Sequence, residues 1–560
     1  MVIKMLTVQM KMVSSVEKCF LSDTLESKPE KNSFIMFKNE RLSFQAMYRS
    51  TETENIVGRP GTAELKIEGS LAKYAKVRLV SNVPNVFPTY SSEPGGEFIT
   101  TEPGMYPDLI RPLMYPNYVK LIHNQTFALW FDIELPKDFE AGAYDLSVTL
   151  HKQGVPEEIF ATTKAEVRVL AAELPKQELV HTEWFYTDCI ANYYNVKAFS
   201  EKHWKYIENF MKVAVRNGIN MILTPVFTPE LDTYVGGERL TTQLVDIELV
   251  SEGKFAFNFD KLNRWIDLAL KCGVEYFEIP HFFTQWGAKA APKIIVKVNG
   301  RNKKYFGWHT DSIGEEYANF LGQLIPALLN EFKKRDLDKK CYFHVSDEPS
   351  LKRLENYKRC KEIIGKHLKG YPIIDALSEL EFYTMGAIEK PAPNTRSALK
   401  FYEAGVPGLW AYYCGGGTAG VSDRSISMPS WRTRILGVQL YLYDIEGFLH
   451  WGYNFYNTQF SYGPLDPFGN PDGGYFTPSG DCFLVYPGSD GNAWESLRLN
   501  ALREGVDDIR ALKLYESKFG KEATKQLILE GTDGEFTFTH YPQGREYLAN
   551  LREKIAKAFM

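Results

Sequence analysis

The sequence of 560 residues contains no block of like charge and no apolar run that approaches the roughly 18 to 20 residues needed to cross a membrane. Its 65 basic and 70 acidic residues are spread along the chain and leave a formal net charge of -5. A chain without a basic patch is poorly suited to bind nucleic acid. We therefore expect a soluble globular protein that has neither a nucleic acid nor a membrane as its partner.

Closely spaced metal ligands are also missing. The seven cysteines are odd in number and none belongs to a Cys-x-x-Cys pair, so we expect reduced and mostly buried thiols. The ten histidines include no His-Glu-x-x-His motif and no close grouping with cysteine. The sequence therefore predicts no catalytic metal.

The first residues show no export signal. Residues 1–11 are interrupted by lysine and glutamine and lack the continuous apolar segment of a signal peptide. This favours a cytoplasmic location, although a signal removed ahead of residue 1 would leave the same pattern.

The first third of the chain is typical of β structure. Up to about residue 175, short runs of alternating polar and apolar residues lie between clusters of Gly, Pro and Asn. The clearest strands are 125–133, 142–150 and 165–170. We predict a β-sandwich domain over residues 1–175.

After residues 174–177 the pattern changes to apolar β-type runs that alternate with helical stretches, which is typical of parallel strands with crossover helices. With 44% hydrophobic residues the chain can bury more than one core. We predict an α/β domain over 176–560, a (β/α)8 barrel of the TIM type that ends in a helical extension from 496. The expected strands are 180–187, 219–224, 274–281, 341–347, 372–377, 407–413, 446–452 and 482–486.

Two adjacent acids, Asp347 and Glu348, stand at the end of the fourth predicted strand, immediately before Pro349. The carboxyl ends of barrel strands are where such folds keep their catalytic groups, so the pair is the leading catalytic candidate. The alternative is structural, because acids followed by proline are also common at the start of a helix.

The adjacency of these acids restricts the mechanism. A retaining glycosidase with two carboxylates needs them about 5 to 5.5 Å apart on either side of the scissile bond. Neighbours on one strand fit another scheme, in which the substrate's own 2-acetamido group attacks the anomeric carbon. Side chains alternate along a strand, and the polar face that includes Glu348 suggests the barrel interior. Glu348 is then the better proton donor, and Asp347 the partner of the acetamide.

Large aromatic and polar residues follow the predicted strands. Aromatic walls with a few acids are typical of a sugar site, because sugar C–H faces pack on rings while hydroxyls need polar partners. The alternative is that aromatics, at 14% of the chain, fall at strand ends by composition alone. The substrate-binding candidates are Tyr186, Asp188, His281, Trp286, Tyr413, Trp451, Tyr453 and Asn454; Thr224, Phe227, Asp375, Tyr412 and Tyr486 follow other strand ends.

One glycine-rich segment has the spacing of a dinucleotide-binding loop. Residues 415–420 follow a predicted strand, but the polar stretch 421–427 offers no helix N-terminus to a pyrophosphate. We interpret the segment as a loop over the barrel mouth and expect no cofactor.

Several segments resemble glycoside hydrolase family 123. They are His-Val-Ser-Asp-Glu-Pro at 344–349 and the stretches 447–454, 484–488, 496–498 and 502–508. The resemblance covers the predicted barrel and, more weakly, the β-sandwich. It implies a retaining exo-β-N-acetylgalactosaminidase that releases terminal GalNAc from glycosphingolipid-type oligosaccharides by the substrate-assisted route. The family's Asp-Glu pair falls on Asp347 and Glu348, as oxazoline stabiliser and acid/base.

Other functions remain open at this stage. The alternatives to this main hypothesis are a hydrolase of another sugar on the same scaffold and a non-catalytic glycan-binding protein. The β-sandwich either braces the barrel or supplies the contact surface of a homodimer.

Overall fold

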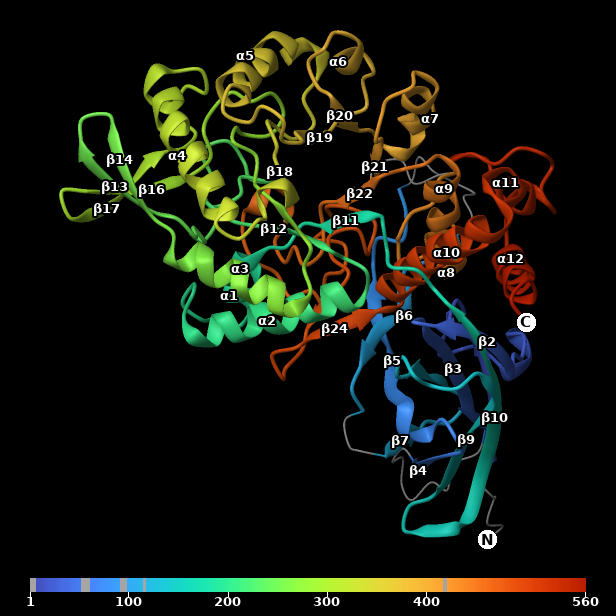
Figure 1. Cartoon of the computed structure of the whole chain (residues 1–560). Coiled ribbons are helices and arrows are strands. Elements are labelled where there is room, and N and C mark those ends of the chain that lie inside the picture. Colours follow the sequence, from blue (N-terminus) through green and yellow to red (C-terminus); the bar gives the residue numbers. More distant parts are fainter. Residues whose placement is uncertain (1–6, 52–60, 91–97, 114–116, 416–419) are drawn as a thin grey trace.

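The computed structural model describes residues 7–51, 61–90, 98–113, 117–415 and 420–560. Two regions are evident in Figure 1, a β-rich N-terminal region and a larger region of parallel strands surrounded by helices. Residues 416–419 of the predicted glycine-rich loop lie outside the described residues. Among the residues described, no helix has the length and apolar character needed to cross a membrane.

The N-terminal region consists of two sheets. One has seven strands in the order β1 (Val8–Ser14), β3 (Arg41–Ser50), β8 (Thr126–Glu134), β5 (Ala75–Asn85), β6 (Gly104–Arg111), β24 (Ala493–Ser496) and β23 (Tyr486–Pro487). The other has five strands in the order β2 (Ser33–Lys38), β10 (Val155–Glu173), β9 (Gly142–Lys152), β4 (Gly61–Glu68) and β7 (Tyr118–Leu121).

The inward-facing apolar residues of both sheets form one core. Phe34 of β2 stacks on Phe44 of β3 with ring centroids 4.6 Å apart, and Phe44 stacks on Phe131 of β8 at 5.4 Å. Leu65 and Val148 are buried in the same cluster. Alternating strands that share a buried face explain the periodicity of the sequence, and the predicted β-rich N-terminal region is confirmed.

The second region contains parallel strands in two sheets. The larger sheet has the order β18 (Cys341–Tyr342), β15 (Tyr276–Glu278), β12 (Met221–Leu223), β11 (Val180–Glu183), β22 (Gly447–His450) and β21 (Trp410–Tyr412). The smaller sheet pairs β19 (Ile374–Ala376) with β20 (Lys390–Ala392). Parallel bridges Phe343–Ile373 and Asn394–Tyr412 connect the smaller sheet to β18 and β21, the two edges of the larger one.

Helices lie outside these strands (Figure 1). The helix α2 shows why they form: the Ser200 side chain accepts the backbone N–H of His203 at its start, and Trp204, Ile207 and Phe210 bury one face. The helices that follow the parallel strands are α1 (Thr187–Tyr193), α2 (Glu201–Arg216), α3 (Asp260–Cys272), α4 (Glu315–Lys333), α5 (Leu354–Gly365), α6 (Glu381–Thr384), α7 (Thr395–Glu403), α8 (Ser430–Arg434) and α9 (Leu436–Leu442).

The predicted eighth strand, 482–486, is wrong. Tyr486 instead begins β23, which pairs antiparallel with β24, and β24 pairs with β6 of the N-terminal sheet. The place in the parallel set belongs to β20, whose sequence Lys390-Pro391-Ala392 is short and includes a proline that cannot donate a ladder hydrogen bond. The apolar run 482–486 predicts a strand. A buried apolar segment, however, does not have to form backbone hydrogen bonds with the parallel sheet.

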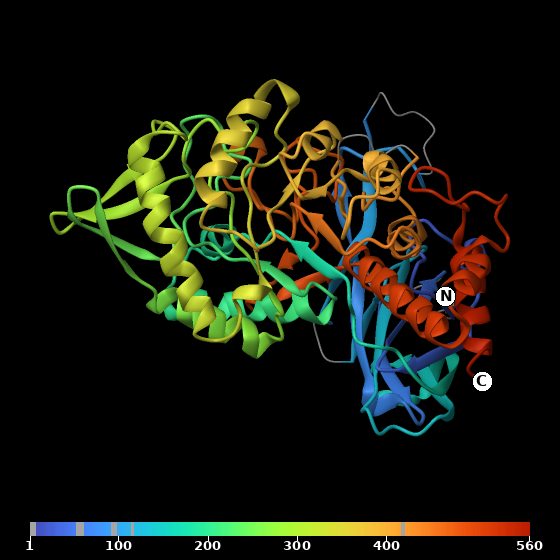
Figure 2. The ribbon, with the colours of Figure 1, turned by 45° about the horizontal axis from the view of Figure 1, so that its top comes forward.

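A four-stranded sheet was not predicted. It has the order β14 (Lys254–Asn258), β13 (Asp246–Ser251), β16 (Ile294–Val298) and β17 (Arg301–Phe306). The sheet projects from the side of the molecule, as Figures 1 and 2 both show in green. It is formed by insertions that precede α3 and follow β15.

The helical end of the chain packs against the N-terminal region. The helices α10 (Leu497–Phe519), α11 (Lys521–Leu529) and α12 (Arg545–Lys557) confirm the predicted helical extension. Figure 2 shows them in red beside the blue strands. A buried ion pair between Arg498 of α10 and Asp108 of β6, with an N–O distance of 2.9 Å, joins the two regions.

Candidate active site

A cavity of about 590 Å³ lies at the carboxyl ends of the parallel strands. Its walls come from the segments that follow β11, β12, β15, β18, β21 and β22, which is where barrel-like folds concentrate binding and catalysis. The lining residues are Tyr90, Trp184, Tyr186, Leu231, Asp232, Gln285, Trp286, Asp347, Glu348, Ala376, Tyr412, Cys414, Gly415, Leu449, Trp451, Gln459, Phe460, Phe476, Thr477 and Asp481.

The adjacent acids Asp347 and Glu348 both line this cavity, at different depths. The backbone carbonyl of Asp347 accepts the N–H of Trp286 at 2.9 Å, and the N–H of Glu348 donates to the carbonyl of Ala376 at 3.1 Å. Asp347 is partly buried, whereas Glu348 is exposed at the mouth. Glu348 has a φ of 40°, in the left-handed region that a residue with a side chain rarely adopts. The turn interrupts the alternation of the strand and directs the two side chains to different levels.

Burial raises the pKa of Asp347 well above its ordinary value. The neighbouring carboxylates of Glu348, Asp375 and Asp232 raise the pKa of Asp347 further, and the positive charge of His344 opposes them. The Asp347 carboxyl therefore keeps its proton to a higher pH than an exposed aspartate.

A short hydrogen bond orients Glu348. The hydroxyl of Tyr412, at the end of β21, donates to Oε1 of Glu348 at 2.6 Å. The alternative role, a helix N-terminus, does not account for the pair. The following helical turn begins at Leu351, and its backbone N–H donates to the Glu379 carboxylate at 2.7 Å, not to Asp347 or Glu348.

A charged network lies beneath the two acids. Burial alone would lower the pKa of His344, but its hydrogen bonds to Asp375 (3.2 Å) and Glu278 (2.7 Å) raise it to about 9. Glu278 also accepts the indole N–H of Trp184 at 2.7 Å, and Asp375 accepts the hydroxyl of Tyr357 at 2.6 Å. The network fixes the cavity floor and places a positive charge below Asp347.

The same network contains a possible ligand set for a metal ion. One ligand atom from each of His281, His344 and Asp375 lies within 4.8 Å of the others. Both ring nitrogens of His344 already hold hydrogen bonds to carboxylates, and binding an ion would require it to release one. We therefore assign His344 and Asp375 to the network, and His281 packs against the His344 ring.

The walls of the cavity are aromatic. The Trp451 indole N–H donates to Asp481 at 2.9 Å, and the Tyr186 hydroxyl donates to the backbone carbonyl of Trp451 at 2.8 Å. Trp184, Trp286 and other rings complete the enclosure. Fixed rings around several acids form a site that can hold a sugar by its C–H faces and its hydroxyls.

Comparisons with known proteins agree with this geometry. A sequence model described as "Glycoside hydrolase 123, catalytic domain" matches residues 184–515, more than half of the chain. The chain belongs to glycoside hydrolase family 123. The family 123 match includes every residue that lines the cavity except Tyr90, which comes from the N-terminal region.

Solved structures support the fold. A family 123 glycoside hydrolase from Clostridium perfringens, described in a study of glycolipid glycan hydrolysis, is 16% identical, with a TM-score of 0.71 over 99% of this chain and 97% of that one. A Bacteroides ovatus GH5 xyloglucanase is 8% identical, with a TM-score of only 0.32 over 85% of this chain and 98% of that one, and it adds nothing to the assignment. No curated protein sequence matches the chain.

Of the substrate-binding residues predicted in this family 123 chain, Tyr186, Trp286 and Trp451 line the cavity. Asp188 does not; it forms an ion pair of 2.7 Å with Arg239, whose guanidinium lies 4.6 Å from the centre of the Tyr186 ring. Asn454 also does not line the cavity. Its side chain accepts the Tyr186 N–H at 2.8 Å and donates to the Tyr186 carbonyl at 3.0 Å. Both residues therefore support Tyr186.

Three further predicted residues point away from the cavity. The Tyr453 hydroxyl donates to the carbonyl of Phe210 at 2.9 Å, and Tyr413 is buried against Phe448 and His450. His281 packs on His344 with ring centroids 4.2 Å apart, and burial lowers its pKa well below the ordinary value. Because successive side chains of an extended segment face opposite sides, a residue next to a lining residue commonly points into the core.

Sequence reasoning missed several wall residues. Asp232, Gln285, Gln459, Phe460, Phe476 and Asp481 line the cavity from long segments that follow β12, β15 and β22. These segments have no hydrophobic periodicity, so no pattern marked which of their side chains face inward.

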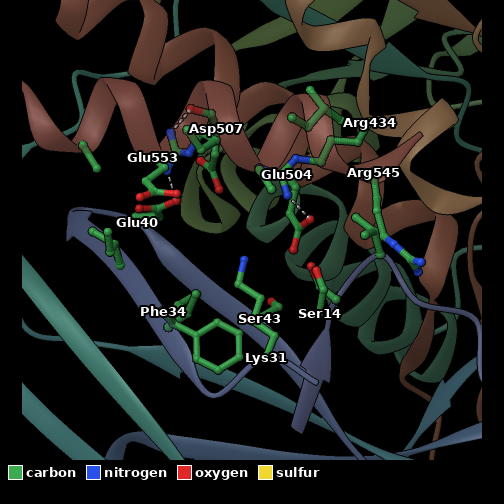
Figure 3. A pocket seen from close by; sticks show the side chains of 18 of the residues that line it. Ser14, Lys31, Phe34, Glu40, Ser43, Arg434, Glu504, Asp507, Arg545 and Glu553 are labelled. Atoms are coloured by element: carbon green, nitrogen blue, oxygen red, sulfur yellow. Dashed lines mark hydrogen bonds and ion pairs between the residues drawn. The ribbon is translucent and has the colours of Figure 1, made fainter. Parts of the chain in front are cut away.

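A second cavity, of about 380 Å³, lies between the N-terminal sheets and the C-terminal helices. Figure 3 shows Arg434, Glu504 and Asp507 on one side of it, facing Lys31 and Ser43. Arg434 pairs with Glu504 at 2.8 Å, and Asp507 is held by Arg503 at 2.6 Å. Since these charges neutralise one another, we interpret this cavity as part of the junction between the two regions of the family 123 fold.

Proposed function

We propose that the chain is a retaining exo-β-N-acetylgalactosaminidase that works through an oxazoline intermediate. The observation that supports this most directly is the position of Asp347 and Glu348, adjacent in sequence but at different depths of one cavity. We also propose that the parallel strands form a (β/α)8 barrel, and that residues 1–175 form a β-sandwich domain with one sheet completed by β24 and β23. The bridges that connect β19 and β20 to the edges of the larger sheet support the barrel.

In the first step the substrate supplies its own nucleophile. Asp347 accepts the N–H of the 2-acetamido group and holds the acetamide against the sugar ring. The acetamide oxygen forms a bond to C1 as the glycosidic C–O bond breaks, and Glu348 gives its proton to the departing oxygen. The ionised Asp347 stabilises the positive charge of the oxazolinium ring.

In the second step Glu348 reverses its role. Its carboxylate removes a proton from a water molecule that attacks C1, the bond between C1 and the acetamide oxygen breaks, and the amide is restored. Two inversions at C1 give net retention. The different exposures of the acids suit this scheme, because the exposed Glu348 must reach both the leaving group and water.

The identity of the sugar is inferred from family membership. The Clostridium perfringens relative is described in connection with glycolipid glycan hydrolysis, and we propose the same class of substrate here, terminal GalNAc on glycosphingolipid-type oligosaccharides. Four acids, Asp232, Asp347, Glu348 and Asp481, line the cavity, and its described lining includes no lysine, arginine or histidine. This charge balance favours an uncharged sugar.

A panel of 4-nitrophenyl β-glycosides tests the reaction. We expect release of nitrophenol from the GalNAc compound, little or none from the galactose compound that lacks the acetamide, and a β-configured sugar as the first product by proton NMR. Cleavage of the galactose compound at a similar rate would rule out assistance by the substrate. Binding of GalNAc compounds without any product would indicate a glycan-binding protein instead.

The raised pKa of Asp347 predicts an acid limb in the pH profile. A carboxyl whose pKa is raised stays protonated at low pH, and the reaction needs its anion, so kcat/KM should rise with pH through a range above that of an ordinary aspartate. Asp232→Asn removes a neighbouring negative charge and should move this limb to lower pH. Burial raises the pKa of Asp232 itself to about 6, so its charge acts only in the upper part of the range.

The control for this profile is Glu252→Gln, on an exposed turn between β13 and β14. It should leave the acid limb in place. An acid limb that stays fixed, or that moves to higher pH, in Asp232→Asn would contradict the assignment of this limb to Asp347.

A further inference from the structure

Four aromatic side chains form a continuous surface that leads out of the cavity, which we call the aromatic ridge: Trp286, Phe460, Tyr462 and Tyr234. Trp286 meets Phe460 edge to face with ring centroids 5.7 Å apart, and Phe460 meets Tyr462 at 6.2 Å. Tyr462 stacks on Tyr234 at 4.8 Å with an interplanar angle of 20°. The inner two residues also line the cavity, so the ridge is continuous with the catalytic site.

The outer part of the ridge is open to solvent. Tyr462 is 70% exposed, Trp286 43% and Tyr234 40%. Large aromatic side chains normally bury their faces, and a contiguous exposed set beside a cavity marks a binding surface.

The backbone holds the ridge in place. The side chain of Asp232 accepts the N–H of Phe460 at 2.9 Å, its carbonyl accepts the hydroxyl of Ser461 at 2.7 Å, and the N–H of Tyr234 donates to the carbonyl of Phe460 at 3.0 Å. Gln285 accepts the N–H of Asp232 at 2.6 Å. The segments that follow β12, β15 and β22 are thereby joined behind the rings.

The ridge also stands on an unfavourable backbone. Asp232, Trp286, Phe460 and Ser461 have φ values of 46°, 58°, 59° and 54°, in the left-handed region that bulky residues avoid. Such conformations persist where the surrounding contacts impose them, and they are concentrated at binding and catalytic sites. The left-handed backbone conformation places the rings of Trp286 and Phe460 at the mouth of the cavity.

The position of the ridge relative to the two acids indicates its ligand. The N–H of Trp286 donates to the carbonyl of Asp347, so the ridge begins beside the catalytic pair. Asp347 lies deeper and holds the sugar that is cleaved, whereas Glu348 faces the mouth and protonates the departing oxygen. Glu348 and the outer rings of the ridge are both exposed, so both lie at the open end of the cavity, toward which the leaving group departs.

We propose that the aromatic ridge binds the leaving group, an uncharged oligosaccharide whose sugar rings pack on Trp286, Phe460, Tyr462 and Tyr234. This inference rests on the proposed function and extends it: the enzyme prefers a terminal sugar attached to further sugars over the same sugar attached to a small aglycone. Tyrosine rings provide flat faces for sugar C–H groups, and their hydroxyls are available to sugar hydroxyls. The acidic lining of the cavity favours an uncharged ligand.

The test compares two soluble substrates with the same terminal β-GalNAc, 4-nitrophenyl GalNAc and a tetrasaccharide without lipid. Tyr462 is two ring contacts from Trp286, so a single nitrophenyl ring gains little from it. We expect Tyr462→Ala to lower kcat/KM about tenfold for the tetrasaccharide and less than about twofold for the aryl compound. Tyr462→Phe should retain most of the preference.

The matched control is Tyr402→Ala. Tyr402 is a partly exposed tyrosine on α7 with a ring contact to Tyr443, outside the ridge. This substitution should leave kcat/KM unchanged for both substrates. Equal losses on both substrates in Tyr462→Ala, or no loss on either, would overturn the proposal, as would a preference that appears only when the oligosaccharide is attached to lipid.

A binding measurement separates this inference from the reaction itself. The trisaccharide that leaves, without GalNAc, should bind the unmutated protein and change its tryptophan fluorescence, and binding should weaken about tenfold in Tyr462→Ala. This result would support the ridge even if the aryl substrates were not cleaved. Absence of binding together with equal kcat/KM for the two substrates would refute it.

Discussion

Glu348→Gln should lower kcat/KM for a GalNAc oligosaccharide by about 10²- to 10⁴-fold, the usual contribution of a positioned general acid. Glutamine preserves the shape of the side chain and can still accept the hydrogen bond from Tyr412, but it has no proton to give to the leaving oxygen. The loss should be smaller for an aryl glycoside whose leaving group departs without protonation. Measuring both substrates therefore separates acid catalysis from a general loss of binding.

Two further variants complete this test. Glu355→Gln is the control for the substitution itself, and Asp347→Asn tests the second acid of the pair. Glu355, on the outside of α5, is exposed and should tolerate the change with full activity. Under the proposed mechanism, Asp347→Asn should lose most of the rate on both substrates, because that mechanism develops an oxazolinium charge whatever group departs. Near-full activity of Glu348→Gln on the oligosaccharide, or of Asp347→Asn on either substrate, with the fold intact, would exclude this assignment of the pair.

Arg498→Met should lower the free energy of unfolding by about 3–5 kcal/mol, because it leaves a buried carboxylate without its cation. Two guanidinium nitrogens of Arg498 donate to Asp108 at 2.9 Å, and a third donates to the carbonyl of Phe483 at 2.6 Å. Tyr486 donates its hydroxyl to the same carboxylate at 2.7 Å. Methionine fills part of the space but supplies none of these donors. Urea unfolding followed by fluorescence would measure the change.

An exposed ion pair provides the comparison. Lys152 and Glu158 lie 3.0 Å apart with both side chains largely in solvent, and Lys152→Met should change stability by less than about 1 kcal/mol. Combining Arg498→Met with Asp108→Asn should restore part of the loss, since no buried charge then remains unpaired. Equal effects of Arg498→Met and Lys152→Met would argue against a structural role for the buried pair.

The sequence identified the catalytic candidates because a strand exit has a local signature. The run before Asp347 is β-prone and Pro349 ends it, so the position at the carboxyl end of a parallel strand followed from neighbouring residues. The strand itself, β18, is only Cys341–Tyr342, although the sequence predicted 341–347. The exit segment is fixed instead by contacts with Trp286 and Ala376, which are distant in sequence.

The remainder of the site depends on directions that a sequence pattern does not specify. Tyr412 reaches Glu348, whereas its neighbour Tyr413 is buried in the core. Asp232 and Phe460 meet across the cavity mouth through a hydrogen bond between segments more than two hundred residues apart. Long connections without periodicity can adopt many paths, and tertiary contacts select one of them. Strand β20 was missed for a related reason, because three residues with a proline give no strand signal.

The pairing of β24 with β6 sets the order in which the molecule can be completed. Strands β1 to β10 leave the ribosome first, yet the sheet that contains β6 receives its last two members only when residues 486–496 have been synthesised. Until then the edge of β6 is unpaired, and Asp108 lacks its ion-pair partner Arg498. Removing the first 175 residues would likewise deprive β24 of its neighbour, so the catalytic region should be expressed together with its N-terminal sheets rather than as an isolated fragment.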